Sequence, residues 1–280
     1  MSDTVKTFKV AIQLCLVCSV VVSSLAVFLG PTQERKREEF RQQSVLSAAG
    51  VWKDGADPAK LFASKAEAIY LNLTAGAPVE IEDEKAKKEA RFNLTKALQD
   101  KDLHQNLDRA IDVAGLKQLE KFTTIYQVKA TTDDGNRDIL VMPVRGKGLW
   151  STLWGFAAID VTDIKDGPEN VTIAGLTYYQ HGETPGLGGE VDNPKWKAKW
   201  LGKKVFDADW NVLVEVSKTA NNDYQVDALS GATLTSNGVT NMLVFWLGEN
   251  GFGPYLKSMA GISSSPDSEK TASTTPKTRS

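Results

Sequence analysis

Cysteine and histidine are scarce in this sequence, and their scarcity limits its metal and thiol chemistry. Only two of the 280 residues are cysteines and two are histidines. Cys15 and Cys18 both lie in an apolar N-terminal segment, so the remainder has no thiol for a disulfide or a cysteine-ligated metal. On a helix they would share one face, as two apolar side chains or as part of an interhelical metal or cluster site. The imidazoles of His104 and His181 are too few for a histidine-rich centre, so no metal site is predicted and metal-assisted hydrolysis is excluded.

An excess of charge of one sign is also missing. Lys and Arg number 33 and Asp and Glu 35, which gives a formal net charge of -2. No long-range field therefore attracts nucleic acid or an anionic membrane surface. Hydrophobic residues make up 41% and charged residues 24%, as in ordinary globular proteins. Without its apolar start and polar end the chain keeps roughly 230 residues, enough for one large domain or two closely packed subdomains with a sizeable core.

One long uncharged run is present, at residues 10–30. At about 1.5 Å per residue, a helix of this length spans about 30 Å, the thickness of the hydrocarbon layer. A cleaved signal peptide is the alternative, because Lys6 and Lys9 provide a basic start and residues 24–26 resemble a cleavage site. The apolar run continues beyond that site to Leu29, which favours a retained transmembrane helix.

The charges beside this helix do not predict an exported domain. Two lysines precede the helix and four basic residues follow it within 35–41, so the positive-inside rule would keep the long domain in the cytoplasm. A short N-terminus before a long domain also fits a signal anchor, which exports its C-terminal side. The prediction of an exported domain therefore rests on the resemblance described below.

The chain divides by composition into five segments: a short N-terminal segment (1–9), the transmembrane helix (10–30), a helical stalk with a membrane-proximal subdomain (31–122), a main domain (123–261) and a disordered tail (262–280). The stalk helix is expected to end at Gly50. Asp57 followed by proline is typical of a helix start. The stretch 84–119, rich in Lys, Glu, Ala and Leu, is also interpreted as helical.

The main domain has the pattern of an antiparallel sheet with flanking helices. Its hairpin signal is the sequence Asp-Asp-Gly at 133–135, between apolar runs at 123–128 and 139–144. Further elements are expected as strands at 153–161, 171–179 and 212–216 and as a final helix at 236–247, with Gly248 as C-cap. These elements predict an α+β fold that follows a single N-terminal transmembrane helix.

Small residues and hydroxyls gather in residues 227–236, at the start of the final helix. The simplest interpretation is a hydroxyl-rich N-cap. The same physics favours a phosphate group, because a helix N-terminus offers unpaired N–H groups and the positive end of the helix dipole. Gly231 and Ala232 leave the Thr233 hydroxyl open, while Thr235 and the serine after it are expected to hydrogen-bond phosphate oxygens. No Walker lysine follows, so a nucleotide triphosphatase loop is not supported.

Two glycine-containing turns supply further candidate contacts. In residues 182–191 the glycines permit close approach of a flat ligand, although the spacing fails the dinucleotide fingerprint and a purely structural turn is an equal alternative. In residues 145–151, Trp150 is suited to pack against a flavin ring and Lys147 to neutralise flavin or phosphate charge. Taken alone, the second turn is more typical of a capped strand end.

Together these residues resemble the NqrC family, which belongs to the Na+-translocating NADH:quinone oxidoreductases. The resemblance covers nearly the whole chain, in the order and spacing of five features: the N-terminal membrane helix, the turn at 146–151, the loop at 182–191, the motif at 230–233 and the ending at 251–254. Residues 33–120 match the family only in general character, so no partner contacts are predicted there.

The resemblance implies FMN bound covalently, as a phosphoester that a flavin transferase forms on Thr233. It implies that the transferase recognises Asp227, Ser230, Gly231 and Ala232. It also implies an isoalloxazine ring near Trp150, Ser151, Thr184, Leu187 and Gly188. No catalytic residue is assigned, because a protein of this family carries electrons and has no substrate of its own.

The resemblance further implies one place in a six-subunit respiratory pump that reduces ubiquinone with NADH and exports sodium ions. The partners would be the five other subunits, the flavin transferase and the bacterial inner membrane, with the domain in the periplasm. The nearest alternative is the homologous flavoprotein of the Rnf ferredoxin:NAD oxidoreductases, which shares the attachment motif but resembles residues 188–191 less closely. An exported, anchored binding protein without flavin is the alternative from another class, and the intact motif argues against it.

Overall fold

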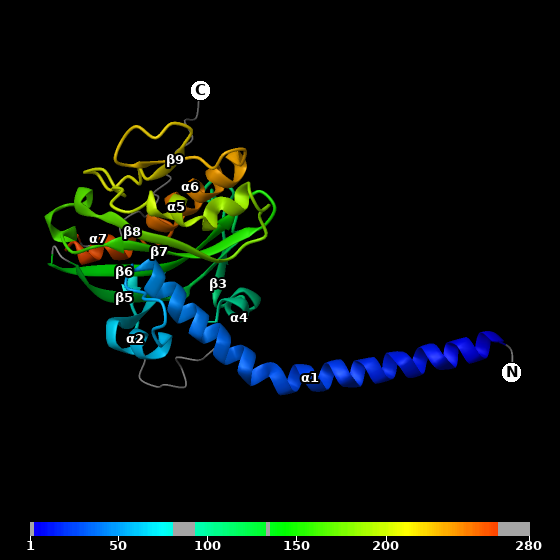
Figure 1. Ribbon diagram of the computed structural model, residues 1–280. Coiled ribbons are helices and arrows are strands. Elements are labelled where there is room, and N and C mark those ends of the chain that lie inside the picture. The colour runs from blue at the N-terminus through cyan, green and yellow to red at the C-terminus, as the bar shows by residue number, and fades with distance from the viewer. Residues whose placement is uncertain (1–2, 81–92, 133–134, 263–280) are drawn as a thin grey trace, which may run out of the picture.

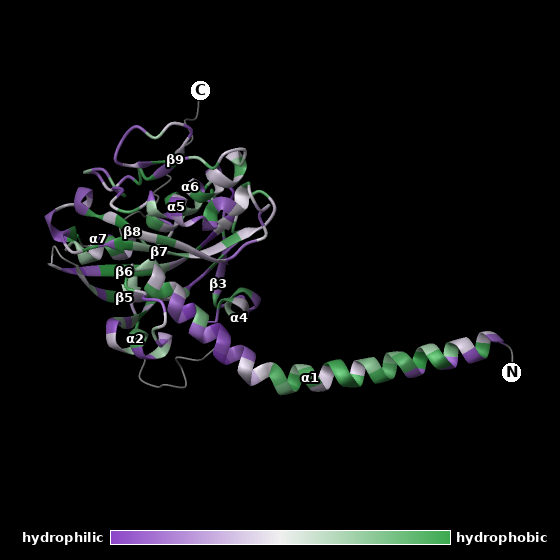
Figure 2. Ribbon diagram, in the orientation of Figure 1, coloured by the Kyte–Doolittle hydropathy of each residue, from purple (hydrophilic) through white to green (hydrophobic). Residues whose placement is uncertain are grey.

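The computed structural model describes residues 3–80, 93–132 and 135–262, which form a long helix and a folded domain (Figure 1). Helix α1 (Asp3–Ala48) has 46 residues, and its N-terminal part extends away from the domain. The apolar part of α1 is exposed and gives way to a polar part at a bend in the helix (Figure 2). Pro31 lies inside α1, and a proline there removes a backbone hydrogen bond and bends a helix.

Helix α1 joins the predicted transmembrane segment and stalk in one element. Among the described residues it is the one helix that is long and apolar enough to cross a membrane. The helix continues without a break through the alternative cleavage site at 24–26. It ends close to the predicted position, because Gly50 has φ of 70°, a conformation that favours glycine and stops the helix.

The domain is built on a six-stranded antiparallel sheet with the order β2-β1-β5-β6-β7-β8. Its strands are β1 (Ala66–Asn72), β2 (Ala77–Pro78), β5 (Phe122–Thr132), β6 (Gly135–Lys147), β7 (Thr152–Asp160) and β8 (Thr172–Gln180). The predicted hairpin is confirmed, since β5 pairs with β6. Of its turn, Asp133 and Asp134 lie outside the described residues. The strands predicted at 153–161 and 171–179 are β7 and β8.

Helices cover both faces of the sheet. Besides α1 they are α2 (Pro58–Lys65), α4 (Leu94–Gln99), α5 (Pro194–Ala198), α6 (Thr233–Leu247) and α7 (Gly253–Met259). Asp57 caps α2 as predicted, accepting from two N–H groups of its first turn. Leu140 of β6 belongs to the apolar cluster that contains α6, whereas its neighbour Val141 belongs to the cluster at the end of α1. The predicted α+β class with an antiparallel sheet and flanking helices is confirmed.

The helix predicted over 84–119 is wrong for the described part of that stretch, which begins at residue 93. Only the short α4 is helical there, and β3 (His104–Asn106) pairs with β4 (Gln118–Glu120). Between these strands, the carboxylates of Asp108 and Asp112 accept hydrogen bonds from nearby backbone N–H groups. Such local side chain–backbone bonds compete with the helical ladder, and composition does not reveal them.

Strand β1 was not expected from the sequence. It pairs with β5 from Ala66↔Val128 to Asn72↔Phe122, so the sheet uses residues on both sides of the boundary predicted between 122 and 123. The β1 side chains do not alternate cleanly between buried and exposed, so the period-2 signal of a strand is weak. The five-segment division stays a prediction, although the stretch 31–122 contributes directly to the main sheet.

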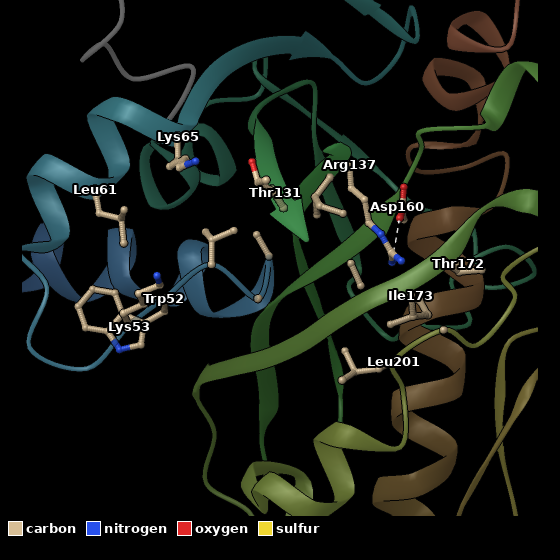
Figure 3. Close-up of a pocket in the computed structure, with 17 residues that line it drawn as sticks. Trp52, Lys53, Leu61, Lys65, Thr131, Arg137, Asp160, Thr172, Ile173 and Leu201 are labelled. Atoms are coloured by element: carbon tan, nitrogen blue, oxygen red, sulfur yellow. Dashed lines mark ion pairs between the residues drawn. The ribbon is translucent and has the colours of Figure 1, made fainter. Parts of the chain in front are cut away.

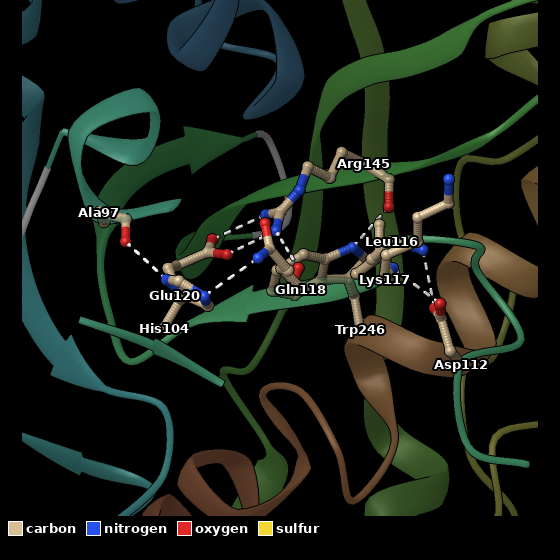
Figure 4. A network of polar contacts seen from close by, with 9 residues as sticks. All are labelled: Ala97, His104, Asp112, Leu116, Lys117, Gln118, Glu120, Arg145 and Trp246. Atoms are coloured by element: carbon tan, nitrogen blue, oxygen red, sulfur yellow. Dashed lines mark hydrogen bonds and ion pairs between the residues drawn. The ribbon is translucent and has the colours of Figure 1, made fainter. Parts of the chain in front are cut away.

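A buried ion pair fixes β6 relative to β4 and α6 (Figure 4). Arg145 donates to the two carboxylate oxygens of Glu120 at 2.8 and 2.6 Å, and both side chains are buried. The indole N–H of Trp246, from α6, donates to the backbone carbonyl of Arg145 at 2.7 Å. Removing one partner of such a pair costs about 3–5 kcal/mol. Because β6 ends soon after, at Lys147, this network holds the following turn in place.

The C-terminal part of the domain agrees with prediction in outline. The strand predicted at 212–216 overlaps β9 (Glu215–Ser217), which pairs in parallel with an unexpected strand, β10 (Gln225–Asp227). Helix α6 begins at Thr233 instead of residue 236, and Gly248 is its C-cap as predicted. Of the predicted tail, residues 263–280 lie outside the described residues.

Candidate functional site

Thr233 is the first residue of α6, and its side chain is exposed. The N-cap residue, Ala232, offers no side-chain hydrogen bond to the first turn. Gly231 has φ of 69° and turns the chain into the helix. In the part of the chain that the structure describes, no hydrogen bond involves the Thr233 hydroxyl. The uncapped first turn and a free hydroxyl therefore lie together, where the helix dipole would stabilise a phosphate group.

Thr235 and Ser236 do not present their hydroxyls to the solvent, contrary to the sequence-based expectation. Thr235 is 1% exposed and donates to a carboxylate oxygen of Glu183 at 2.7 Å. Ser236 is also buried, and its hydroxyl accepts from the backbone N–H of Leu229 at 3.1 Å. Successive helical residues are rotated by about 100°, so the outward position of Thr233 turns the next threonine inward. Thr235 supports the site from inside.

Glu183 connects the three segments that carry the predicted site residues. One carboxylate oxygen accepts from the backbone N–H groups of Trp150 and Ser151 at 3.1 and 3.0 Å, and from the Ser151 hydroxyl at 3.1 Å. The other accepts from the Leu149 N–H at 3.2 Å and from Thr235. Sequence reasoning missed Glu183, because a single glutamate in a glycine loop gives no sign of partners in segments distant along the chain.

Glycines allow these segments to approach each other closely. A Cβ at Gly188 would lie 2.5 Å from the Thr235 hydroxyl oxygen, and one at Gly148 would lie 2.6 Å from a Glu183 oxygen. Contacts this short are essentially never made by real Cβ atoms. Gly188 therefore allows a close approach between the loop and α6, and its predicted contact with the flavin ring stays a prediction.

Three large apolar side chains on the turn, the loop and the first turn of α6 are exposed. Trp150 is 69% exposed, Leu187 44% and Leu234 59%. Leu187 approaches the segment before Thr233, since a Cβ at Gly231 would lie 3.0 Å from one of its methyl groups. Large exposed apolar side chains in one place mark a surface that binds a ligand or partner. They are suited to cover a flat ring.

The remaining predicted residues lie in the same three segments or directly before α6. Lys147 and Thr184 lie beside the turn and the loop, and Ser230 is exposed beside α6. Asp227 pairs with Lys199 at 2.8 Å and accepts from a backbone N–H, and these contacts hold the pKa of its carboxyl below the usual value. Asp227 thus orders the segment leading to α6.

These residues fit a phosphate-bearing flat group such as FMN. The uncapped helix start suits the phosphate, the free hydroxyl of Thr233 suits an ester bond, and the exposed indole of Trp150 suits a ring. The glycines leave the backbone accessible without side chains in the way. The covalent bond and the individual contacts stay predictions.

The site lies at the end of the sheet that is nearer the apolar part of α1. Gly175 of β8 packs against Ala48, since a Cβ there would lie 2.2 Å from the Ala48 carbonyl oxygen. Further along β8, Tyr179 lines a cavity with Arg37 and Phe40 of α1. The C-terminal end of β8, which leads into the 182–191 loop, therefore lies beside the part of α1 that is nearer its apolar segment.

A second cavity, of about 550 Å³, lies at the opposite end of β8 (Figure 3). Trp52, Lys53 and Leu61 line it on one side, and Arg137 pairs with Asp160 at 3.5 Å on the other. None of the predicted site residues lines this cavity. It is therefore separate from the surface around Thr233.

Known proteins match this chain over nearly its whole length. The Na(+)-translocating NADH-quinone reductase protein NqrC of Pseudomonas aeruginosa is 43% identical over 266 residues, covering 92% of this chain and 96% of the relative. The protein of the same name from Yersinia pestis is 42% identical over 258 residues, covering 90% and 91%. The chain belongs to the NqrC family of these reductases.

Solved structures and the family of FMN-binding domains agree with this membership. The crystal structure of Shewanella oneidensis NqrC superposes with a TM-score of 0.68 at 30% identity, covering 81% of this chain and 99% of the other. The corresponding crystal structure from Parabacteroides distasonis, at 24% identity and a TM-score of 0.54, supports the fold alone. The FMN-binding domain model matches residues 148–248, from the turn beside Trp150 to the C-cap of α6.

The predicted resemblance is therefore confirmed. These relatives carry the name of the quinone reductase, so the alternative of an Rnf flavoprotein is not favoured. The FMN-binding match favours a flavin carrier over a flavin-free anchored binding protein. The matched range also includes Glu183, the residue that sequence reasoning missed.

Proposed function

We propose that this chain carries FMN as a phosphoester on Thr233 and transfers single electrons within a Na+-translocating NADH:ubiquinone reductase. The observation that carries the proposal is the exposed Thr233 hydroxyl on the uncapped first turn of α6, inside the FMN-binding match. Bound FMN supplies the one-electron chemistry, and the protein supplies position and electrostatics. The chain thus needs no catalytic residue of its own.

The surrounding residues have separate tasks in this proposal. The first-turn N–H groups of α6 stabilise the phosphate charge, and Lys147 adds a positive charge at the edge of the site. Trp150 and Leu187 cover the ring and exclude water from part of it. Thr184, Ser151 and Gly188 bring polar groups and backbone close to the ring edge. The transferase recognises Asp227 and the segment from Ser230 to Ala232, of which Ser230 and Gly231 are exposed directly before Thr233.

The proposed location is the outer side of the bacterial inner membrane, with α1 retained as the anchor. Support comes from the continuous α1 helix, whose buried end, Val45 to Ala48, packs against the domain. The flavin end of the sheet would then face the membrane, where the five other subunits of the pump would exchange electrons with it. Protease added to intact spheroplasts should digest the domain, and protection until the membrane is breached would contradict this location.

The function is tested in membranes that contain the assembled pump. With the natural chain, NADH should drive quinone reduction and bleach the flavin attached to this protein. Thr233→Ala should leave the pump assembled but remove quinone reduction, because one carrier in the electron path is missing. Full quinone reductase activity in an assembled pump with Thr233→Ala would contradict the proposal.

A further inference from the structure

Glu183 is a buried carboxylate whose charge is offset only by hydrogen-bond donors. The residue is 5% exposed, and among the described residues no lysine or arginine pairs with it. Its donors are three consecutive backbone N–H groups, at Leu149, Trp150 and Ser151, and two hydroxyls. A buried carboxylate that loses such donors is costly, because charges are poorly stabilised in a low-dielectric interior.

Glu183 is ionised at neutral pH. Burial alone would raise the pKa of its carboxyl, but the hydrogen bonds from Thr235 and from the backbone N–H groups of residues 149–151 outweigh burial and lower the pKa. The site therefore holds a fixed negative charge packed against two glycines, Gly148 and Gly188, since a Cβ on either would lie 2.6 or 2.8 Å from a carboxylate oxygen.

We propose that Glu183 is the positioning residue of the flavin site: it locks the 148–151 turn, the 182–191 loop and the first turn of α6 into one rigid unit, and its charge lowers the reduction potential of the bound flavin. This inference rests on the proposed function. The inference extends the proposed function, because it assigns control of the flavin's position and reduction potential to a residue that is not the attachment point.

The geometry explains why one carboxylate has this effect. The turn carries Trp150, the loop carries Leu187, and α6 carries Thr233 two residues before the Thr235 hydroxyl that donates to Glu183. A shift in the carboxylate therefore moves both ring neighbours relative to the attachment point. Because reduction of a flavin adds electrons to the ring, a nearby carboxylate without a cation makes reduction less favourable.

The test uses the full chain, co-expressed with a flavin transferase and purified in detergent. Glu183→Gln keeps the shape but presents an NH2 group to backbone N–H donors, so at least one hydrogen bond is lost. The matched control is Glu190→Gln in the same loop, whose carboxylate accepts a side-chain hydrogen bond from Asn193 alone at 2.7 Å. The readouts are the flavin reduction potential, the visible circular dichroism of the flavin and the intact mass.

We expect Glu183→Gln to keep the covalent flavin, to raise its reduction potential and to weaken its visible circular dichroism. Glu190→Gln should match the natural chain in all three. A second pair separates the α6 link from the charge: Thr235→Val removes the hydroxyl donor and should weaken the circular dichroism, and Thr235→Ser should restore it. This pair also keeps the test valid if Glu183→Gln does not fold.

Three outcomes would overturn the inference. A folded Glu183→Gln with unchanged potential and circular dichroism would make Glu183 an ordinary structural residue. Equal effects of Glu190→Gln would show that any carboxylate in the loop suffices. If Thr235→Val and Thr235→Ser behave alike, the link to α6 has no role. A natural chain that takes up no flavin is a different result, since it contradicts the proposed function before any variant is compared.

Discussion

Two threonines in one helical turn have opposite surroundings. Thr233 is exposed, whereas Thr235 is buried against Glu183. The sequence predicts the helix start, the small neighbours and the phosphate preference, since these follow from local physics. It does not predict which hydroxyl points inward, because that depends on the packing of α6 on the sheet. The role of Glu183 is unpredictable for the same reason.

At Trp150, the exposed indole predicts an effect on the flavin without an effect on folding. Trp150→Ala should keep the covalent flavin and change stability by less than about 0.5 kcal/mol, as is usual for exposed positions. The flavin should become more accessible to a soluble quencher and its reduction potential should change, because the ring loses its cover. Quenching and potentiometric titration check this.

The matched control is Trp52→Ala, an indole beside the second cavity and away from Thr233. It should leave the flavin signals unchanged. If Trp150→Ala and the control give the same quenching and the same potential as the natural chain, Trp150 does not contact the ring.

At Glu183, the lowered pKa predicts how stability depends on pH. A carboxyl whose pKa is lower in the folded than in the unfolded chain stabilises the fold above its unfolded value of about 4.3, and this contribution is lost as pH falls through the folded pKa. The difference in unfolding free energy between the natural chain and Glu183→Gln should therefore be largest near neutral pH and shrink in acid. Denaturant titrations between about pH 3 and 7 measure it. If the difference in unfolding free energy does not change with pH, the ionised Glu183 carboxylate is not the source of the stabilisation.

At the scale of elements, those with strong local sequence signals were predictable, and those that depend on long-range pairing were not. The hairpin of β5 and β6 and the C-cap of α6 follow from turn residues and periodicity. Strand β1 depends on its pairing with β5, and the loop between β3 and β4 depends on two aspartates that bind backbone N–H groups. Neither dependence is visible in composition.

The contact between α1 and β8 predicts a sensitive glycine. Gly175→Ala would place a Cβ 2.2 Å from the Ala48 carbonyl oxygen, so the end of α1 or the strand must shift. Overpacking of this kind costs about 1–3 kcal/mol, which should lower the thermal midpoint of the full chain by several degrees. The control is Gly30→Ala, which meets nothing within 4 Å in α1 and should not lower the midpoint. Equal midpoints for both variants would show that α1 is not tightly docked.

At the scale of the whole molecule, the packing of helix α1 sets how the domain lies relative to the apolar N-terminal segment. Helix α1 leads from the apolar segment along β8, so the Thr233 surface lies at the end nearer that segment and the second cavity at the far end. The single long apolar helix was predictable from an uncharged run. The orientation was not, because it follows from how α1 packs on the sheet.

The central claim is the covalent attachment of FMN to Thr233, and the intact mass of the denatured full chain tests it most directly. A phosphoester survives denaturation, whereas hydrogen bonds and ring packing do not. After co-expression with a flavin transferase, the natural chain should gain the mass of FMN less one water. Thr233→Ala should lack this gain, and Thr235→Ala should keep it, because its buried hydroxyl is not the attachment point. A natural chain without added mass, or a Thr233→Ala chain that still gains it, would contradict the account.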